Sequence, residues 1–466
     1  MPDIQLADER LWLPSGESRV EPASSGDFVL YWMQVTHRAH DNPALNFAVH
    51  QANDLGVPVL VYHGLRHDYP WASDRLHTFI LEGVRDLVAD FADRGIQYAF
   101  HLDQREKGAK GSRDDSPLVQ LAERARLVVT DWYPTFIMPR QLKRLREKVG
   151  VPVVAVDSAT VVPARLLEKQ YSAARWIRPE LMKRLDDWLH PVGDLDPDKR
   201  GTVELPFDPT EPGDDIAELV AGCAIDHSVP PARGWTGGSG AAHERLEWWV
   251  EHGLPRYLER NDPNLDVTSK LSPYLHFGHI APQAMLLAAR DAGHKEEYEK
   301  FVDEAVVWRE LAVNFCRFEP KHRTVAGIPD WARKELAEQE DAPRDALYDD
   351  EELERAETDD ELWNACQRAY LRDGWMHNYC RMLWGKSVIG WTENAERALR
   401  ILEHLNNKYA LDGRDHNTYG GILWCFGRFD RPFFRRDVYG TVRYMSTNAA
   451  RKKFDVDEYI ASMTEA

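Results

Sequence analysis

The residues best suited to chemistry lie in the second half of the chain, where hydroxyls, a lysine, carboxylates and indoles gather in short segments. Residues 268–278, TSKLSPYLHFG, join hydroxyls and a lysine to an apolar helix start, a combination that suits phosphate binding at a helix N-terminus. An ordinary serine-capped helix that follows a turn would have the same sequence pattern.

A second segment, residues 301–315, places a carboxylate near an indole. Its sequence, FVDEAVVWRELAVNF, predicts a helix on which Glu304, Trp308 and Leu311 lie four and three residues apart and therefore share a face. Such a face could hold a flat heterocycle, whereas a helix with one core tryptophan and one exposed glutamate has the same spacing. Residues 375–391 and 405–426 add polar and aromatic groups, although LDGRD in the latter also fits a simple polar turn.

The C-terminal part of the chain carries a local excess of positive charge. Residues 428–453 contain eight basic side chains against two acidic ones, with phenylalanines and tyrosines between them. A solvated basic end that balances an acidic chain is one interpretation. The interleaved aromatic rings, among them Phe433 and Phe434, favour a nucleic-acid contact.

The first part of the chain predicts a doubly wound parallel sheet. Five short apolar runs alternate with amphipathic segments, at residues 27–32, 57–62, 96–102, 126–130 and 151–156. Asn42 before Pro43 predicts a helix start, and Gly56, Gly95 and Gly150 stand where helix C-caps should lie.

Ligands of such sheets bind beyond the carboxyl ends of the strands, here around residues 33–41, 63–71 and 131–136. No GxGxxG pattern follows the first strand. A flavin or nucleotide oxidoreductase that uses this sheet therefore lacks its main fingerprint.

The sequence changes character after the sheet. Residues 191–242 are rich in proline, glycine and aspartate, which indicates a connection, and long helical segments follow at 243–259 and 376–389. Thr358 and Glu361 fit a capping box before another helix. We therefore expect an α/β domain at 1–190, a linker at 191–242 and an all-helical domain at 243–466.

Composition limits the classes of function. The 466 residues carry a net charge of −19, which argues against sequence-independent coating of DNA. Five cysteines without a CxxC pair argue against a zinc site or a disulfide framework, so we expect no metal. The N-terminus, MPDIQLADER, lacks the basic start and apolar run of a secretory signal, which predicts a cytoplasmic protein.

Several motifs, in one order and at compatible spacings, resemble the photolyase and cryptochrome family and, within it, the class II cyclobutane pyrimidine dimer photolyases. The resemblance covers nearly the whole chain. It is carried by YWMQVTHRAHDNPAL at 31–45, RNDP at 260–263, TSKLSPYLHFG, EAVVWRELAVNF, MHNYCRMLWGK, LDGRDHNTYGGILW and FGRFDRPFFRRDVYGTVRYMS at 426–446.

The resemblance implies FAD in a U shape inside the helical domain, fully reduced in the active state. The positions that match its phosphate and sugar contacts are Tyr257, Thr268, Ser269, Lys270, Leu271 and Ser272. Those around the isoalloxazine and ribityl chain are Arg381, Asn406, Asp412 and Gly413. The N-terminal sheet of the family can hold an antenna chromophore, and here a deazaflavin, a reduced folate and an empty pocket stay open.

The implied reaction is electron transfer from photoexcited reduced flavin to a flipped pyrimidine dimer in DNA, ring opening and electron return. Positions that match dimer contacts are Glu304, Trp308, Met382 and Trp424, and those at the DNA opening are Arg260 and Asn261. The basic residues that would grip phosphates are Arg428, Arg431, Arg435, Arg436 and Arg443.

Three tryptophans match the family's electron relay to photoexcited oxidised flavin, with Trp384 nearest the flavin, Trp363 next and Trp391 outermost. We expect a monomer. The alternative is a cryptochrome-like photoreceptor that binds FAD without repair, and the basic, aromatic C-terminal segment argues against it.

Overall fold

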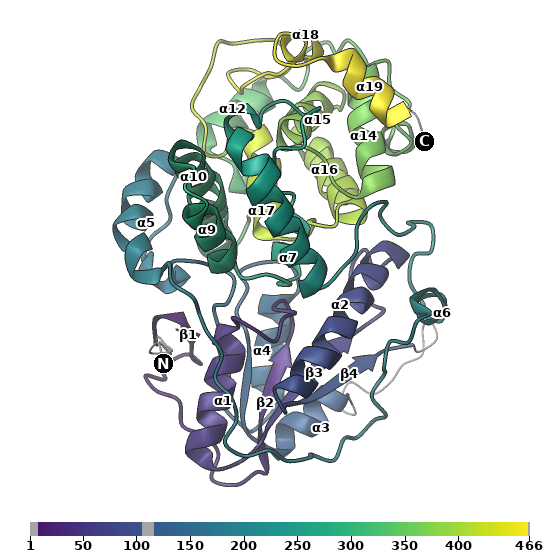
Figure 1. Cartoon of the computed structure of the whole chain (residues 1–466). Coiled ribbons are helices and arrows are strands. Elements are labelled where there is room, and N and C mark those ends of the chain that lie inside the picture. The colour runs from purple at the N-terminus through teal and green to yellow at the C-terminus, as the bar shows by residue number, and fades with distance from the viewer. Residues whose placement is uncertain (1–7, 105–115, 465–466) are drawn as a thin grey trace.

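The N-terminal part of the chain folds around a six-stranded sheet, and the computed structural model describes residues 8–104 and 116–464 (Figure 1). The strand order is β1-β6-β5-β2-β3-β4, and every neighbouring pair is parallel except β1 with β6. The strands are β1 (Leu11–Trp12), β2 (Phe28–Met33), β3 (Val59–Leu65), β4 (Gln97–Leu102), β5 (Ala125–Asp131) and β6 (Val153–Val156). All five predicted strands are confirmed. The unpredicted β1 has two residues, too few for periodicity to show.

Helices cover both faces of this sheet because its central strand is apolar on both. Val29 and Tyr31 of β2 pack in one cluster with residues of the front helices, and Phe28 and Leu30 pack in another with residues of the rear helices. This alternation follows the two-residue period of a strand. The front helices are α1 (Pro43–Leu55) and α2 (Asp74–Asp93), and the rear ones α3 (Pro117–Arg124) and α4 (Met138–Lys148).

The predicted helix ends hold at α1 and α2 but not at α4. Asn42 accepts a hydrogen bond from the Leu45 amide at 3.0 Å, and Gly56 closes α1 with φ of 63°. Gly95 follows α2 with φ of 64°. The prediction of a C-cap at Gly150 was wrong, because α4 ends at Lys148 and its C-cap is Val149, whose extended backbone leads directly toward β6 and needs no left-handed residue.

The carboxyl edge of the sheet faces the helical half. The amide of His37, in the loop after β2, donates to the carbonyl of Phe277 at 3.0 Å. A Cβ at Gly278, where φ is 69°, would lie 2.3 Å from the carbonyl oxygen of Val35, so only glycine allows this approach. The edge where the sequence predicts a ligand region is thus partly covered by the helical half.

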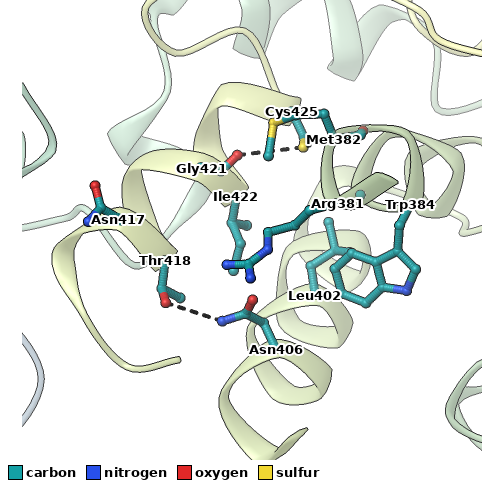
Figure 2. Close-up of a pocket in the computed structure, with 11 residues that line it drawn as sticks. Arg381, Met382, Trp384, Leu402, Asn406, Asn417, Thr418, Gly421, Ile422 and Cys425 are labelled. Carbon is teal, nitrogen blue, oxygen red and sulfur yellow. Dashed lines mark hydrogen bonds between the residues drawn. The ribbon is translucent and has the colours of Figure 1, made fainter. Parts of the chain in front are cut away.

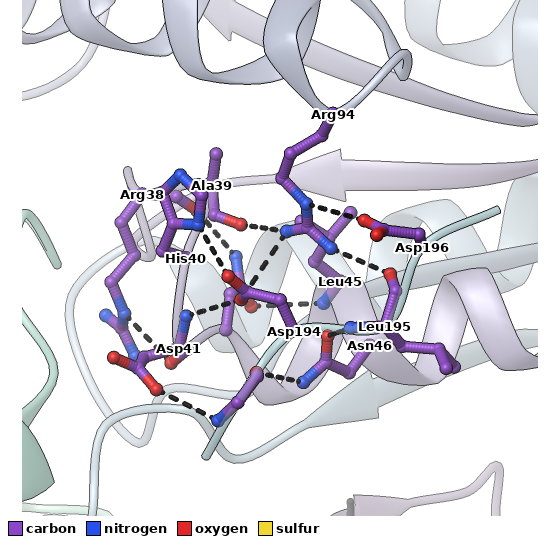
Figure 3. Close-up of polar contacts among 12 residues, drawn as sticks. Arg38, Ala39, His40, Asp41, Leu45, Asn46, Arg94, Asp194, Leu195 and Asp196 are labelled. Carbon is purple, nitrogen blue, oxygen red and sulfur yellow. Dashed lines mark hydrogen bonds and ion pairs between the residues drawn. The ribbon is translucent and has the colours of Figure 1, made fainter. Parts of the chain in front are cut away.

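The segment 191–242 is ordered along the α/β part. Its Val203 amide donates to Gln97 at 2.6 Å, and its short helix α6 (Ile216–Ala221) contacts α2. Near its start, Asp194 accepts hydrogen bonds from His40 at 2.5 Å and the Asp41 amide at 2.9 Å (Figure 3). The domain boundaries at 190 and 242 stay a prediction.

The C-terminal part is built from helices, as predicted. After α5 (Ala174–Trp188), these are α7 (Ser239–Trp248), α8 (Ser272–His276), α9 (Pro282–Asp291), α10 (Lys295–Val302), α11 (Arg309–Phe318), α12 (Asp330–Glu338), α13 (Asp350–Glu354), α14 (Glu361–Asp373), α15 (Asn378–Gly390), α16 (Ala395–Tyr409), α17 (His416–Cys425), α18 (Thr447–Ala450) and α19 (Val456–Thr464). Within residues 8–104 and 116–464, none of these or the other helices has the length and apolar character needed to cross a bilayer.

Three details of the predicted helices were wrong. The helix expected over 243–259 changes at Trp249 into a π-helical turn and at Leu254 into a 3₁₀ turn. The N-cap of α14 is Asp360, whose carboxylate accepts from the Trp363 amide at 3.0 Å, whereas Thr358 bonds to Asn364 instead. The helix over 301–315 contains a π-helical turn, Asp303–Trp308, between α10 and α11.

A buried arginine of the α/β part joins the two halves. Arg75 of α2, 1% exposed, donates to the carbonyls of Tyr370 and Tyr409 at 2.7 Å each and to that of Leu371 at 2.7 Å. These carbonyls lie in the last turns of α14 and α16, where helices leave acceptors without internal partners. A guanidinium there also opposes the negative end of each helix dipole.

Candidate functional site

A small cavity lies among α15, α16 and α17 (Figure 2). We call it the helical cavity. Its lining residues among those described are Arg381, Met382, Trp384, Gly385, Leu402, Asn406, Asn417, Thr418, Gly421, Ile422 and Cys425. The structure therefore brings together four of the predicted site residues, Arg381, Met382, Trp384 and Asn406, from two helices.

The Asn406 amide is held in one orientation. Its Oδ1 accepts from the Tyr370 hydroxyl at 2.8 Å, and its Nδ2 donates to the Thr418 hydroxyl at 3.2 Å. The residue is 1% exposed. A buried amide fixed on both sides loses little freedom when it meets a ligand, so it can act as a rigid polar group at the cavity wall.

Arg381 and Asp412 form an ion pair beside the cavity. One guanidinium nitrogen lies 3.1 Å from both carboxylate oxygens of Asp412. Burial lowers the pKa of Arg381, but the Asp412 carboxylate raises it by more than burial lowers it. The net pKa is therefore above the usual value. The Nε of Arg381 has no hydrogen-bond partner among the described residues, which leaves a buried donor for a ligand.

The turn that carries Asp412 also contains Gly413. A Cβ at Gly413 would lie 2.8 Å from the carbonyl oxygen of Asn406 and 3.1 Å from that of Ala410. Only glycine therefore lets this turn pack onto the end of α16. Burial, and then the neighbouring Asp412, raise the pKa of Asp415 to about 6.

The predicted phosphate segment forms only one helical turn, α8. Its N-cap is Leu271, with no side-chain cap, so the alternative of a serine-capped helix was wrong, whereas phosphate binding at the start of this helix stays a prediction. The segment nevertheless holds a free donor, because the buried Thr268 hydroxyl has no partner among the described residues. The Lys270 ammonium lies 3.0 Å from Asp266 and 5.4 Å from the Trp375 ring. Ser269 and Ser272 are half-buried beside it, and Tyr257 packs edge-on against Phe301.

Three tryptophans form a chain of ring contacts that begins at the helical cavity. Trp384, which lines the cavity, stacks on Trp363 with centroids 6.2 Å apart and planes 10° apart. Trp363 meets Trp391 edge-on at 5.5 Å. The first two rings are buried, Trp391 is half-buried, and Tyr348 contacts its outer side at 5.3 Å.

Glu304 lies in a second group of charged residues, outside the helical cavity's described lining. Its carboxylate is 2.8 Å from the Lys300 ammonium and 3.5 Å from the Arg260 guanidinium. Trp308 and Leu311 pack on the same core, Leu311 fully buried, while the Glu304 side chain is 34% exposed. The two apolar residues of the predicted face thus pack on one core, while the shared face with Glu304 stays a prediction. Asn261 is exposed next to Arg260.

The basic segment near the C-terminus surrounds several aromatic rings. Arg443 lies 5.4 Å from the Trp424 ring and 5.6 Å from that of Phe433. Phe434 is 93% exposed. The other basic residues differ in their partners: Arg431 lies over Phe433, Arg436 over Tyr444, and Arg428 over Phe315, whereas Arg435 is paired with Glu335 at 3.3 Å and Glu338 at 2.9 Å.

Sequence reasoning missed the residues that hold the predicted ones in place. Gln367 accepts from Trp384 Nε1 at 3.0 Å, and Tyr370 donates to Asn406. Both lie on α14 four and seven residues after Trp363, a helical spacing that could have placed them on the same face. The Thr418 hydroxyl carried no local signal, because its role depends on α16 and α17 packing together.

Known proteins resemble this chain along most of its length. The sequence model of the DNA photolyase family matches residues 29–194. The deoxyribodipyrimidine photo-lyase of Methanothermobacter thermautotrophicus is 34% identical over 455 residues, 97% of each chain. That of Oryza sativa is 34% identical over 94% of this chain and 87% of the relative, and that of Potorous tridactylus is 30% identical over 100% and 86%.

Two solved structures share the fold. A class III photolyase from Agrobacterium tumefaciens superposes with a TM-score of 0.69 at 20% identity, covering 97% of this chain and 88% of that one. A cryptochrome from Synechocystis has a TM-score of 0.66 at 16% identity, covering 94% and 88%.

Proposed function

Because the chain belongs to the DNA photolyase family, we propose that it is a light-driven DNA repair enzyme that uses FAD to split cyclobutane pyrimidine dimers. The observation that carries the proposal is the helical cavity, whose wall combines a fixed amide, a buried guanidinium and the first indole of a three-ring chain. The motifs at 31–45 and 426–446 support class II as its subtype. It acts as a monomer in the cytoplasm.

The cofactor part of the proposal is supported by donors that lack protein partners. The Arg381 Nε and the Thr268 hydroxyl are buried without partners among the described residues, at positions that the motifs assign to FAD. When bound and reduced, FAD supplies the photoexcited electron that opens the cyclobutane ring and takes the electron back.

The protein's own residues orient and tune this chemistry. Arg381, kept charged by Asp412, places a positive charge where the reduced ring is negative. Asn406 presents its amide in a fixed orientation, and Gly413 lets the polar turn approach. Tyr257, Ser269, Lys270, Leu271 and Ser272 hold the phosphates and sugars. Because these groups are set before light is absorbed, they need no rearrangement during electron transfer.

The substrate part of the proposal assigns the remaining polar and aromatic residues. A dimer must leave the DNA stack to reach a buried cofactor. Trp308, Met382 and Trp424 pack against it, and Glu304 hydrogen-bonds the thymine edge. Arg260 and Asn261 lie at the opening, while the arginines of residues 428–443 contact phosphates and fill the gap that the dimer leaves.

We also propose that the N-terminal sheet holds an antenna chromophore, either a deazaflavin or a reduced folate. Chromophore extracted from the purified protein identifies it by absorbance and mass. An extract that contains FAD alone would remove the antenna and leave the repair function untouched.

The decisive experiment is repair itself. Protein reduced under anaerobic conditions is incubated with an oligonucleotide that contains one thymine dimer, in blue light and in darkness. We expect light-dependent restoration of the thymines, measured by chromatography. Flavin binding and photoreduction without any repair would favour the photoreceptor alternative.

A further inference from the structure

Two indoles lie near the helical cavity, and only one of them belongs to the three-ring chain. Trp384 and Gly421 line the cavity (Figure 2). Trp424 follows Gly421 by three residues on α17. Residues three positions apart on a helix are neighbours on its surface, so Trp424 lies only about 4.5 Å along the helix axis from a residue of the cavity wall. The cavity thus has two candidate electron donors.

Two cations lie over the Trp424 ring. The Lys386 ammonium is 4.7 Å from the ring centroid, and the Arg443 guanidinium carbon is 5.4 Å from it. Both distances are within the range of a cation–π contact. Because the Trp424 side chain is half-buried, solvent screens these charges only in part. The indole therefore lies in a positive electrostatic field.

Lys386 is buried without an acidic partner. It is 0% exposed, and its ammonium donates to the carbonyl of Cys425, the last residue of α17, at 3.0 Å. Within residues 8–104 and 116–464, no carboxylate lies within ion-pair distance of this ammonium. Burial lowers the pKa of Lys386 to about 8, which leaves it charged at neutral pH. A buried charge without an opposite charge is costly, so capping α17 alone does not account for this lysine.

The indoles of the three-ring chain have different surroundings. The Trp384 N–H donates to Gln367 Oε1 at 3.0 Å, and the Trp363 N–H donates to the Trp384 carbonyl at 3.0 Å. An oxygen acceptor favours a positive charge on the ring that donates to it, whereas a nearby cation opposes one. Among the described residues, no lysine or arginine lies over either of these two rings. Loss of an electron is therefore easier at Trp384 and Trp363 than at Trp424.

We propose that Lys386, together with Arg443, prevents Trp424 from giving an electron to the photoexcited flavin, so that oxidation is confined to Trp384 and the rings behind it. The inference rests on the proposed function, because the acceptor is photoexcited oxidised FAD. Lys386 is absent from the described lining of the cavity and acts through Trp424, by electrostatic repulsion. The indole that packs against the dimer is thereby kept intact while the relay loses the electron.

The test removes the cation from a chain whose first electron route is blocked. Trp384→Phe and Trp384→Phe/Lys386→Met proteins with oxidised FAD bound are illuminated without oxygen and with excess dithiothreitol, and absorbance follows flavin reduction. The dithiol refills Trp424, loses two electrons and two protons and closes to a disulfide. The flavin takes both electrons and one proton, and the other proton goes to solvent. We expect the double variant to reduce its flavin at least about tenfold faster than Trp384→Phe.

Further variants separate repulsion from a loss of structure. Adding Trp424→Phe to the double variant should return the rate to that of Trp384→Phe, because the new donor is gone. Arg443→Met in the Trp384→Phe protein removes the other cation and should also speed reduction, which keeps the test open if Lys386→Met fails to fold. Lys453→Met, which removes an ammonium 4.7 Å from the ring of Tyr379, should leave the rate unchanged.

A second measurement does not involve the flavin. In darkness, azide radicals made by radiolysis take single electrons from indoles, and mass spectrometry of the digested protein compares oxidised Trp424 with oxidised Trp176, which is 57% exposed. Lys386→Met should raise this ratio at least about threefold. An unchanged ratio, or unchanged photoreduction in both cation variants, would overturn the inference. If the parent still repairs dimers, the inference alone is lost, whereas a chain that binds no FAD overturns both.

Discussion

At the scale of single residues, Trp384 allows photoreduction of oxidised flavin to be tested separately from repair by reduced flavin. Its ring lines the helical cavity, stacks on Trp363 and is held by Gln367. The proposed repair uses flavin that is already reduced, so a relay through the three tryptophans, as the motifs predict, would matter for activation and not for ring splitting.

We predict that Trp384→Phe abolishes photoreduction yet preserves repair after reduction with dithionite, because phenylalanine does not supply the electron that an indole supplies. Absorbance under blue light and dimer repair measure the two steps separately. Trp32→Phe, a buried tryptophan of the sheet, is the control. Photoreduction of Trp384→Phe at the parent rate would contradict the relay.

Glu304 is half-exposed and paired with Lys300 and Arg260, which hold its carboxylate in place as an acceptor. We predict that Glu304→Ala weakens dimer repair by about 1–3 kcal/mol, or roughly 5- to 150-fold in kcat/KM, while FAD stays bound. Glu299→Ala, which removes an exposed carboxylate of the preceding helix α10, should change neither quantity. Equal repair by the two variants would place the substrate contact elsewhere.

At the scale of elements, the basic segment after α17 contains arginines with unequal freedom. Arg436 lies over Tyr444 and is exposed, whereas Arg435 is held by two glutamates of α12. A cation that is already neutralised releases few counterions when it meets DNA.

We therefore predict that Arg436→Ala lowers the slope of log affinity against log salt by about one unit, as expected for one lost phosphate contact. Arg435→Ala should lower it by clearly less. Binding titrations with dimer-containing DNA at several salt concentrations measure both slopes. A larger effect at Arg435 would show that α12 releases this arginine in the complex.

Near the start of the segment 191–242, Asp194 is bound to His40 of the α/β part, and both side chains can titrate (Figure 3). The hydrogen bond to Asp194 raises the pKa of His40. Burial raises the pKa of Asp194, but His40 and Arg94 outweigh it and the net pKa is lowered. The histidine's stabilisation is complete below its ordinary pKa of about 6.5 and is lost as pH rises, while the carboxylate's is present above about 3.9 and is lost as pH falls.

We predict that Asp194→Asn lowers the free energy of unfolding most between pH of about 3.9 and 6.5, where both partners are charged. The loss should be about 0.2–1 kcal/mol, because the pair is partly exposed. The deficit should shrink above pH 7. Denaturant titrations across pH measure it. Asp196→Asn, which removes a more exposed carboxylate near Arg94, should show no such pH dependence. A deficit that does not vary with pH would rule out the His40 contribution.

Much of the architecture was predictable because its signals are local. The five parallel strands follow from apolar runs, and Asn42 and Gly56 mark the ends of α1. The π-helical turn at Asp303–Trp308 and the cap at Asp360 were not predictable, because the neighbouring sequence fits an ordinary helix equally well. The candidate site residues come from motifs and stay a prediction. Their supports, such as Gln367 and Thr418, depend on helices that meet only in the folded chain.

At the scale of the whole molecule, Arg75 is one of the buried contacts that tie the two halves together. Burial lowers its pKa to about 10, still high enough for it to stay charged at neutral pH. We predict that Arg75→Met lowers the free energy of unfolding by at least about 3 kcal/mol, because several buried carbonyls lose a charged partner. Thermal unfolding measures it. Arg85→Met, an exposed arginine of the same helix, should stay within about 0.5 kcal/mol of the parent.

The same guanidinium affects how the chain melts. A link between the last turns of α14 and α16 and a helix of the sheet makes each half part of the other's folded state, so the halves have little reason to melt separately. In a scanning calorimeter the protein should then absorb heat in a single peak, with its van't Hoff enthalpy close to the calorimetric one. The Arg75→Met substitution should split or broaden that peak. The ratio of the van't Hoff enthalpy to the calorimetric enthalpy should then fall below one.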